Sequence, residues 1–283
     1  MSITLFDTFL RHRKYVDNYS KHTIDTYSQA MRTWKRVLGE REIDKQSIKD
    51  FVIKMREANI SAASCNVYLK AFNGFLNWLY ENEYISEPLH IKHLKFERQI
   101  IKPFSDSHLK AIISFRPNNF CEQRLHTLLL LLIDCGARID EALSLRREDI
   151  DFDSLLIRVR GKGKKQRLIP FSMELRKTLF KFLSKHQFDL VFCTRNGTKY
   201  SYGNCWRDFR ILAEKLGLEG VRVSPHSLRH TFARNYLREG GNVFYLSKAL
   251  GHSNIQTTKL YIEVETEDLQ ETHLKTSILS RLR

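Results

Sequence analysis

The sequence predicts a mainly α-helical protein with a small β-sheet, arranged as two domains. Apolar residues recur at helical spacing through residues 1–86 and again through much of the second half. One stretch of the second half changes to a period of two, which is typical of strands. A length of 283 residues is comfortable for two domains, and a hydrophobic content of 42% suffices to form their cores.

Four helices are expected within residues 1–86. In SKHTIDTYSQAMRTWKRVLG, apolar side chains recur every three or four residues until Gly39. The segments DKQSIKDFVIKMREAN and SAASCNVYLKAFNGFLNWLYENEY each open on an Asp or Ser that can cap a helix, and Ser2 is the candidate cap of SITLFDTFLRHRKY. Their large aromatic residues are expected to form a core, which leaves the intervening Lys and Arg to contact a partner.

Helical periodicity fails in EPLHIKHLKFERQIIKPF, so residues 87–104 are predicted to be a linker. Helices are then expected in SDSHLKAIISF and EQRLHTLLLLLIDC, with Gly136 ending the second and Arg138 near the start of the next. LLIRVRGKGKKQRLIPF predicts a β-hairpin with residues 161–165 at its tip. The expected elements that follow are helices in ELRKTLFKFLSKH and YGNCWRDFRILAEKLGL, a short strand in LVFC, and further helices from residue 224 onward.

The charge of the chain indicates a polyanionic partner. It carries 47 Lys and Arg against 32 Asp and Glu, a net charge of +15, and both halves are basic. No apolar run approaches the roughly 18–20 residues that cross a bilayer, and the start lacks the order of a secretory signal. The five cysteines form no C-x-x-C pair, which predicts a reduced, intracellular protein without a cysteine metal cage.

Two segments near the end combine residue types that handle phosphate. SPHSLRHTFARNYLREGG places His226 and Arg229 one helical turn apart, and LGHSNIQTTKLYI supplies His252 and Tyr261. GARIDEALSLR adds Arg138 after a glycine turn, and the hairpin tip adds a lysine. Arginine forks bind phosphate through paired N–H bonds, a tyrosine hydroxyl can attack phosphorus, and histidine and lysine can move protons.

The histidines have two other interpretations. His226 and His230 have the spacing of a zinc pair, so a metal-dependent hydrolase built on them and His252 is one alternative. The zinc motif H-E-x-x-H has a glutamate where Ser227 stands, and Arg229 beside the pair would repel a dication. Neither a metal nor a cofactor is therefore expected. Histidines satisfied within a core are the other alternative, which local sequence does not dismiss.

These segments resemble the tyrosine recombinase (phage integrase) family over essentially the whole chain. The family pattern of Arg, Lys, His-x-x-Arg, His or Trp, and Tyr matches GAR, GKG, HSLR, GH and LYI in order. The site residues that this resemblance implies are Arg138, Lys162, His226, Arg229, His252 and Tyr261.

Several neighbours of these positions have other expected roles. Lys164, Lys165 and Arg167 could replace Lys162 or bind the DNA backbone. Glu141, one turn after the first site arginine, is expected to lie outside the site and to orient an arginine. His230 is expected to be structural and to pack beneath the second site arginine.

The resemblance implies site-specific breakage and rejoining of double-stranded DNA without ATP or metal. Tyr261 is the expected nucleophile and forms a 3′-phosphotyrosyl bond, while Arg138 and Arg229 neutralise the phosphate. His226 is the expected acceptor of the tyrosine proton, and Lys162 is expected to protonate the leaving 5′-oxygen. In this scheme His252 donates a hydrogen bond to a phosphate oxygen, and strands are exchanged through a Holliday junction.

The resemblance also implies a two-domain, C-shaped DNA clamp. Residues 1–86 are the expected core-binding (SAM-like) domain, and residues 105–283 the catalytic domain. The expected assembly is a tetramer on two inverted-repeat core sites, or a pair with a related recombinase, in which residues 266–282 dock on a neighbouring protomer. The expected location is the cytoplasm, at the nucleoid.

The biological role stays open at this point. Chromosome-dimer resolution, transposon cointegrate resolution, integron recombination and phage integration share this chemistry. Because the first helix is expected to begin at Ser2, a simple resolvase or Xer-type protein is favoured over an integrase with an extra arm-binding domain. A non-catalytic DNA-binding relative is the alternative function, although binding alone does not require Tyr261.

Overall fold

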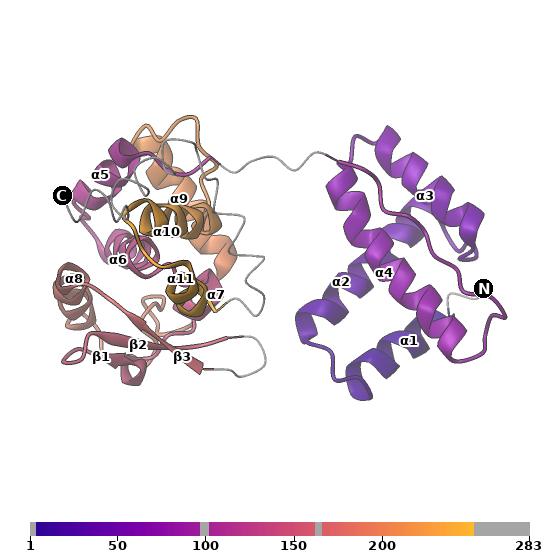
Figure 1. Ribbon diagram of the computed structural model, residues 1–283, viewed down its shortest axis with the longest axis horizontal. Helices are drawn as coiled ribbons and strands as arrows, with labels where there is room; N and C mark the ends of the chain where they lie inside the picture. Colours follow the sequence, from indigo (N-terminus) through magenta and orange to yellow (C-terminus); the bar gives the residue numbers. More distant parts are fainter. Residues whose placement is uncertain (1–3, 97–101, 162–165, 252–283) are drawn as a thin grey trace, which may run out of the picture. The chain divides into compact units, whose positions relative to one another are not determined.

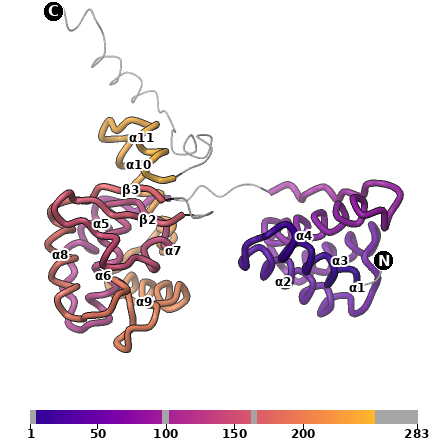
Figure 2. The backbone as a smooth tube through the Cα atoms, turned by 90° about the horizontal axis from the view of Figure 1, so that it is seen from below, coloured from indigo at the N-terminus to yellow at the C-terminus, as the bar shows by residue number. Residues whose placement is uncertain are grey.

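The computed structural model describes residues 4–96, 102–161 and 166–251. The chain divides into two compact units, Met1–Gln99 and Ile100–Arg283. The helices and strands of each unit are labelled in Figure 1 and can be followed along the backbone in Figure 2. The predicted fold class, mainly α-helical with a small sheet, is confirmed.

The first unit contains the four predicted helices. They are α1 (Thr4–Tyr15), α2 (Lys21–Leu38), α3 (Lys45–Glu57) and α4 (Ala62–Glu81). Ser20, Asp44 and Ser61 cap the last three, because each side chain accepts a hydrogen bond from the backbone N–H three residues later. The caps Asp44 and Ser61 were predicted from the sequence and Ser20 was not, while the predicted cap Ser2 lies outside the described residues.

Aromatic side chains form the core of the first unit, as predicted. The fully buried rings include Phe6, Phe9, Trp34, Phe51, Phe72 and Phe75. The ring of Phe72 lies 5.0 Å from that of Trp34 and 5.5 Å from that of Phe51, measured between centroids. Such tilted and edge-on pairs add to the free energy gained from burial.

The segment after α4 packs on the first unit. Asn73 exchanges two hydrogen bonds of 2.8 and 2.9 Å with the backbone of Ile91, and Asn66 exchanges two of 2.9 and 2.8 Å with that of Leu94. The side chains of Ile91 and Leu94 lie against the hydrophobic core. The first part of the predicted linker 87–104, up to Leu94, therefore packs against the helical unit.

The second unit combines helices with a three-stranded antiparallel sheet in the order β1-β2-β3. Its elements are α5 (Asp106–Ser114), α6 (Phe120–Cys135), α7 (Ile139–Ala142), the 3-10 helix η1 (Arg147–Asp149), β1 (Ile150–Asp151), β2 (Leu156–Arg160), β3 (Gln166–Pro170), α8 (Met173–Leu183), α9 (Tyr202–Lys215), α10 (Pro225–Arg238) and α11 (Val243–Leu250). The hairpin strands β2 and β3 are as predicted, while β1 was not predicted.

The predicted strand in LVFC, residues 190–193, is wrong. Leu190 and Cys193 form only isolated bridges, with Arg146 and Lys199 respectively. Val191 and Phe192 between them are fully buried. The apolar run therefore reflects burial of a loop and not membership of a sheet.

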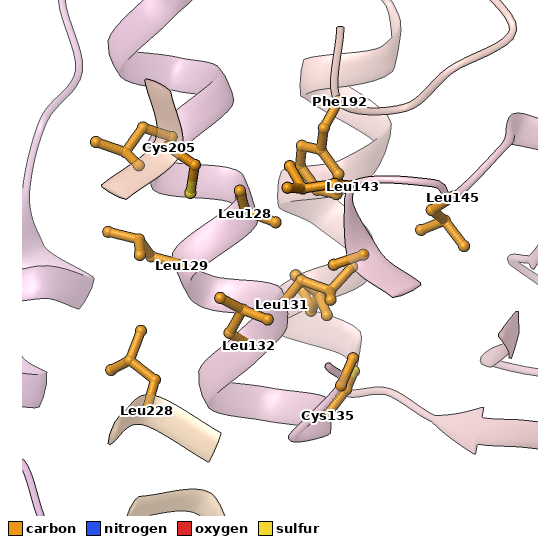
Figure 3. Packing of buried hydrophobic residues seen from close by; sticks show 14 of the residues in the cluster. Leu128, Leu129, Leu131, Leu132, Cys135, Leu143, Leu145, Phe192, Cys205 and Leu228 are labelled. Atoms are coloured by element: carbon orange, nitrogen blue, oxygen red, sulfur yellow. The ribbon is translucent and has the colours of Figure 1, made fainter. Parts of the chain in front are cut away.

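Helix α6 lies at the centre of the second unit and packs against α5, α8, α9 and α10. Figure 3 shows its leucines between Leu143, Leu145 and Phe192 on one side and Cys205 and Leu228 on the other. Leu128, Leu129, Leu131 and Leu132 are at most 1% exposed. This central helix fixes the position of its own C-terminal end, where Gly136 and Arg138 follow.

Gly136 ends α6 with a φ of 59°, a left-handed conformation that favours glycine. A Cβ at this position would lie 2.2 Å from Cδ1 of Phe232, on α10. The absence of a side chain thus allows α10 to pack closely against the end of α6.

Replacing Gly136 by alanine is expected to lower the free energy of unfolding by about 3 kcal/mol or more, since backbone strain adds to overpacking. Gly217→Ala is the matched control: its φ is 62°, but no heavy atom lies within 4 Å of the added Cβ. The control should lose only the strain, about 1–2 kcal/mol. Urea denaturation followed by circular dichroism measures both losses, and equal losses would contradict the close packing of Phe232.

Candidate active site

Arg138 stands at the start of α7, where the turn after Gly136 places it. Oε2 of Glu141 accepts a hydrogen bond of 2.9 Å from the Arg138 backbone N–H, which closes the first turn of the helix. The Arg138 guanidinium donates from Nη1 to Glu141 at 3.0 Å and from Nη2 to the carbonyl of Gly251 at 2.8 Å. Its side chain is 40% exposed, so a ligand can reach it.

Arg229 lies on α10 and is only 3% exposed. Its Nη1 donates to the carbonyl of Gly136 at 2.7 Å, and its Nη2 to the carbonyl of Leu250 at 2.7 Å. Arg229 therefore joins the C-terminal end of α6 to that of α11. Carbonyls at helix ends lack partners within the helix and attract cations, which explains this pairing.

The two predicted site arginines thus meet at one place in the fold. Arg138 and Arg229 are far apart in sequence but bind the adjacent carbonyls of Gly251 and Leu250. Figures 1 and 2 both show α10 beside α11, the two helices that bring Arg229 and these carbonyls together. Two guanidinium groups at one place concentrate positive charge at the end of α11, and Arg138 is the more exposed of the two.

His226 lies on α10 one turn before Arg229 and is exposed to solvent. The protein atoms around its ring still desolvate it enough to lower its pKa, and the positive charges of Arg229, Arg222 and Arg138 lower the pKa further. The ring is therefore neutral at pH 7 and has a nitrogen free of a proton. A neutral imidazole near two arginines can accept a proton from a nucleophile.

His230 packs edge-on against His226, with the ring centroids 4.6 Å apart and the rings at 88°. Burial lowers the pKa of His230 to about 4, with smaller contributions from His226 and Arg229. This ring is neutral over the whole physiological range. Its ring contacts that of His226, and the structural role beneath Arg229 stays a prediction.

Glu141 lies beside the site arginines, although the sequence predicted it outside the site, and Arg167 lies there as its partner. Glu141 is 6% exposed and accepts hydrogen bonds from both Arg138 and Arg167. Burial raises the pKa of Glu141, but the hydrogen bonds from Arg167 and Arg138 outweigh that effect and lower it, so the carboxylate is charged. The R-x-x-E spacing predicted its contact with Arg138, whereas no sequence signal predicted its contact with Arg167.

The other predicted site residues, Lys162, His252 and Tyr261, lie outside the described residues. The structure does describe the residues next to them in the sequence: β2 and β3 precede and follow residues 162–165, and Gly251, the C-cap of α11, precedes His252. The predicted protomer-contact segment, residues 266–282, also lies outside the described part of the chain.

Within residues 4–96, 102–161 and 166–251, no group of three or more His, Cys, Asp or Glu side chains is placed to hold a metal ion. Over the same ranges, the structure contains no helix with the length and apolar character that crossing a membrane requires.

Comparison with known protein families decides the classification. Residues 102–268 match the Phage integrase family, and residues 6–83 match the N-terminal SAM-like domain of phage integrases. The chain belongs to the phage integrase family. It is a tyrosine-type site-specific DNA recombinase, as the resemblance of its sequence motifs predicted.

Curated relatives of this recombinase match over nearly their full length. Tyrosine recombinase XerA of Thermococcus kodakarensis is 29% identical over 283 residues, which cover 98% of this chain and 95% of the relative. Tyrosine recombinase XerC of Bacillus subtilis is 29% identical over 293 residues, with coverages of 96% and 94%.

Solved structures share the recombinase fold. The Tn1549 transposon integrase in complex with a circular intermediate DNA superposes with a TM-score of 0.81 at 20% identity, covering 100% of both chains. A lambda integrase dimer bound to a core site superposes with a TM-score of 0.76 at 17% identity, covering 94% of this chain and 98% of the other.

Proposed function

We propose that this recombinase cleaves a strand of double-stranded DNA by attack of Tyr261 on the scissile phosphate, while Arg138 and Arg229 bind that phosphate. The observation that supports the proposal most strongly is the meeting of the two arginines at the carbonyls of Leu250 and Gly251. The chain leads directly from these carbonyls into the segment that contains His252 and Tyr261.

The proposed reaction exchanges one phosphodiester for another. The Tyr261 oxygen forms a bond to phosphorus, and the bond from phosphorus to the 5′-oxygen breaks. His226 accepts the phenol proton, and Lys162 supplies a proton to the leaving oxygen. Since the 3′-phosphotyrosyl bond replaces the broken bond, no ATP is needed, and a 5′-hydroxyl from a partner strand reverses the step. Arg138, Arg229 and His252 stabilise the charge on the non-bridging oxygens.

This mechanism predicts an acid limb in the pH profile of cleavage. Protonated His226 cannot accept the phenol proton, and desolvation and nearby arginines keep its pKa below the ordinary value of 6.5. At subsaturating DNA the rate reports the free enzyme. The acid limb due to His226 should therefore have its midpoint below pH 6.5 and level off as the pH rises above that value. His226→Gln should slow cleavage and remove this limb. A limb centred above pH 6.5 in the free enzyme would contradict the assignment.

We infer that both units contact the duplex as a clamp, with residues 1–86 as the core-binding part. The excess of basic residues in both halves supports this arrangement. The DNA is expected to be a core site with inverted repeats, bound by a tetramer on two sites or by a pair with a related recombinase. The solved complexes of a lambda integrase dimer on a core site, and of XerH on difH, support a DNA core site as the partner. The proposed location is the cytoplasm, at the nucleoid.

Covalent capture tests the proposed function. The recombinase is incubated, in the presence of a chelator, with random-sequence duplexes that carry a central nick, which lets the short product dissociate and traps the adduct. Denaturation in detergent then isolates covalent complexes, and mass spectrometry of the digested complex identifies the modified residue. We expect trapped duplexes of a common sequence, attached through Tyr261. Attachment at another residue, a requirement for divalent metal, or DNA binding without any adduct would overturn the proposal.

A further inference from the structure

The C-terminal end of α11 is held by three arginines, which donate to three consecutive carbonyl groups. The pairs and their N–O distances are Arg167–Ala249 (2.7 Å), Arg229–Leu250 (2.7 Å) and Arg138–Gly251 (2.8 Å). The end of a helix carries a partial negative charge and carbonyls without helical partners, so guanidinium groups stabilise it. Two of these arginines are proposed to bind phosphate. For the third, Arg167, the sequence suggested only a role as a substitute for Lys162 or as a contact to the DNA backbone.

Arg167 lies on β3, where the alternation of the strand directs it toward the inner face shared with Ile169. Its side chain is 14% exposed. Nη1 and Nη2 donate to the two oxygens of Glu141 at 2.7 and 2.8 Å, and Nε donates to Ala249. Each of its three nitrogens therefore has a protein oxygen as partner. Arg167 is therefore a bridge that joins β3 to Glu141 and to the end of α11.

Arg167 contacts both of the groups that hold the Arg138 guanidinium, namely the Glu141 carboxylate and the end of α11 at Gly251. Arg167 and Arg138 share Oε1 of Glu141, and Arg167 has the shorter bond, 2.7 Å against 3.0 Å. A buried carboxylate without Arg167 would pair more fully with Arg138 and draw its guanidinium away from a ligand. Arg167 also lies against Gly251, where an added Cβ would be 3.0 Å from the guanidinium.

We propose that Arg167 is a positioning residue for DNA cleavage. It balances the charge of Glu141, so that Arg138 stays available to the phosphate, and it fixes the last turn of α11, from which the chain enters His252. This role rests on the proposed function of Arg138 and Tyr261. It predicts that Arg167 contributes to the rate of the chemical step at saturating DNA and not to DNA affinity, since a displacement of about 1 Å in a catalytic group can cost about 100-fold in rate.

The test compares single-turnover cleavage with DNA affinity and stability. The probe is one of the nicked duplexes that the parent recombinase traps covalently. The protein is at saturating concentration, and the temperature is well below the melting temperature of each variant. Arg167→Met removes the bridge, and Arg167→Lys keeps one charge beside Glu141 but cannot reach both Glu141 and Ala249. We expect each variant to cleave about 10-fold more slowly or worse, with a dissociation constant within about 2-fold of that of the parent. Methylguanidinium added to Arg167→Ala should restore part of the rate.

Arg124→Met is the matched control for loss of a buried arginine. Arg124 is 5% exposed, donates to the carbonyl of Cys193 at 3.0 Å and lies 3.7 Å from the ring centroid of Tyr200. This variant should lower the melting temperature but cleave at the parent rate, and methylguanidinium should not accelerate it.

The outcomes separate the positioning role from the proposed function itself. If the parent forms no adduct, the proposed function fails. If the parent cleaves and both Arg167→Met and Arg167→Lys cleave at the parent rate, Arg167 is only structural. Weakened DNA binding with an altered salt dependence would instead make Arg167 a direct phosphate contact, which also overturns the proposal. Should Arg167→Met not fold, Arg167→Lys decides the question: slow cleavage at unchanged DNA affinity supports the proposal, and cleavage at the parent rate overturns it.

Discussion

Tyr261→Phe is expected to abolish the covalent adduct while the dissociation constant for DNA stays within about 2-fold of the parent value. Phenylalanine keeps the ring and most of its apolar area but has no oxygen to form the bond to phosphorus. The cleavage rate should therefore fall by more than about 1000-fold, as expected when the nucleophile of a covalent mechanism is removed. A denaturing gel of the trapped duplex and a binding titration measure the two quantities.

Tyr245→Phe is the control for this substitution. Tyr245 lies on α11 and is 68% exposed, so its hydroxyl can be removed without disturbing the core. The control should form the adduct at the parent rate. An adduct that persists in Tyr261→Phe would identify a different nucleophile and contradict the proposed mechanism.

Arg229→Lys is expected to reduce both cleavage and stability. Lysine keeps the positive charge, but its single ammonium cannot reproduce the two bonds that Arg229 makes to Gly136 and Leu250. Leaving one buried carbonyl without a partner costs about 1–3 kcal/mol in the free energy of unfolding. Loss of the planar fork should also slow single-turnover cleavage by about 100-fold or more. Urea denaturation and the nicked-duplex assay provide the two measurements.

Arg234→Lys controls for a change of the same type on the same helix. Arg234 is exposed and lies inside α10, so its side chain is neither buried nor at a helix end. Its stability should change by less than about 0.5 kcal/mol. Parent-like stability of Arg229→Lys would mean that the carbonyl bonds contribute little. Parent-like cleavage by Arg229→Lys would remove this arginine from the proposed phosphate site.

The helices of this recombinase could be predicted from the sequence because their signals are local. Ser20, Asp44 and Ser61 cap helices within three residues of themselves, and apolar periodicity marks the buried faces. The strand predicted for residues 190–193 failed because a buried apolar run looks the same in a loop and in a sheet. The packing of residues 87–94 on the helical unit also escaped prediction, since it depends on Asn66 and Asn73, which are distant in sequence from their partners.

The same division between local and distant signals applies to the site. The sequence motifs predict Arg138, His226 and Arg229 as site residues, and the structure places the three near one another. The R-x-x-E spacing predicts the contact of Glu141 with an arginine. The bridge made by Arg167 joins β3 to α7 and to the end of α11. Neither contact has a fixed spacing along the chain, so only the folded structure could reveal them. The pKa shifts of His226 and His230 likewise depend on burial that a sequence does not specify.

The double use of Arg229 bears on how recombinases of this kind can change over evolution. A lineage that no longer needs to cut DNA can exchange its nucleophile at little cost, but discarding Arg229 would also disconnect the ends of α6 and α11. Selection for folding alone would therefore preserve this arginine. Its presence in a homologue says little about whether that homologue is active, whereas loss of the tyrosine says a great deal.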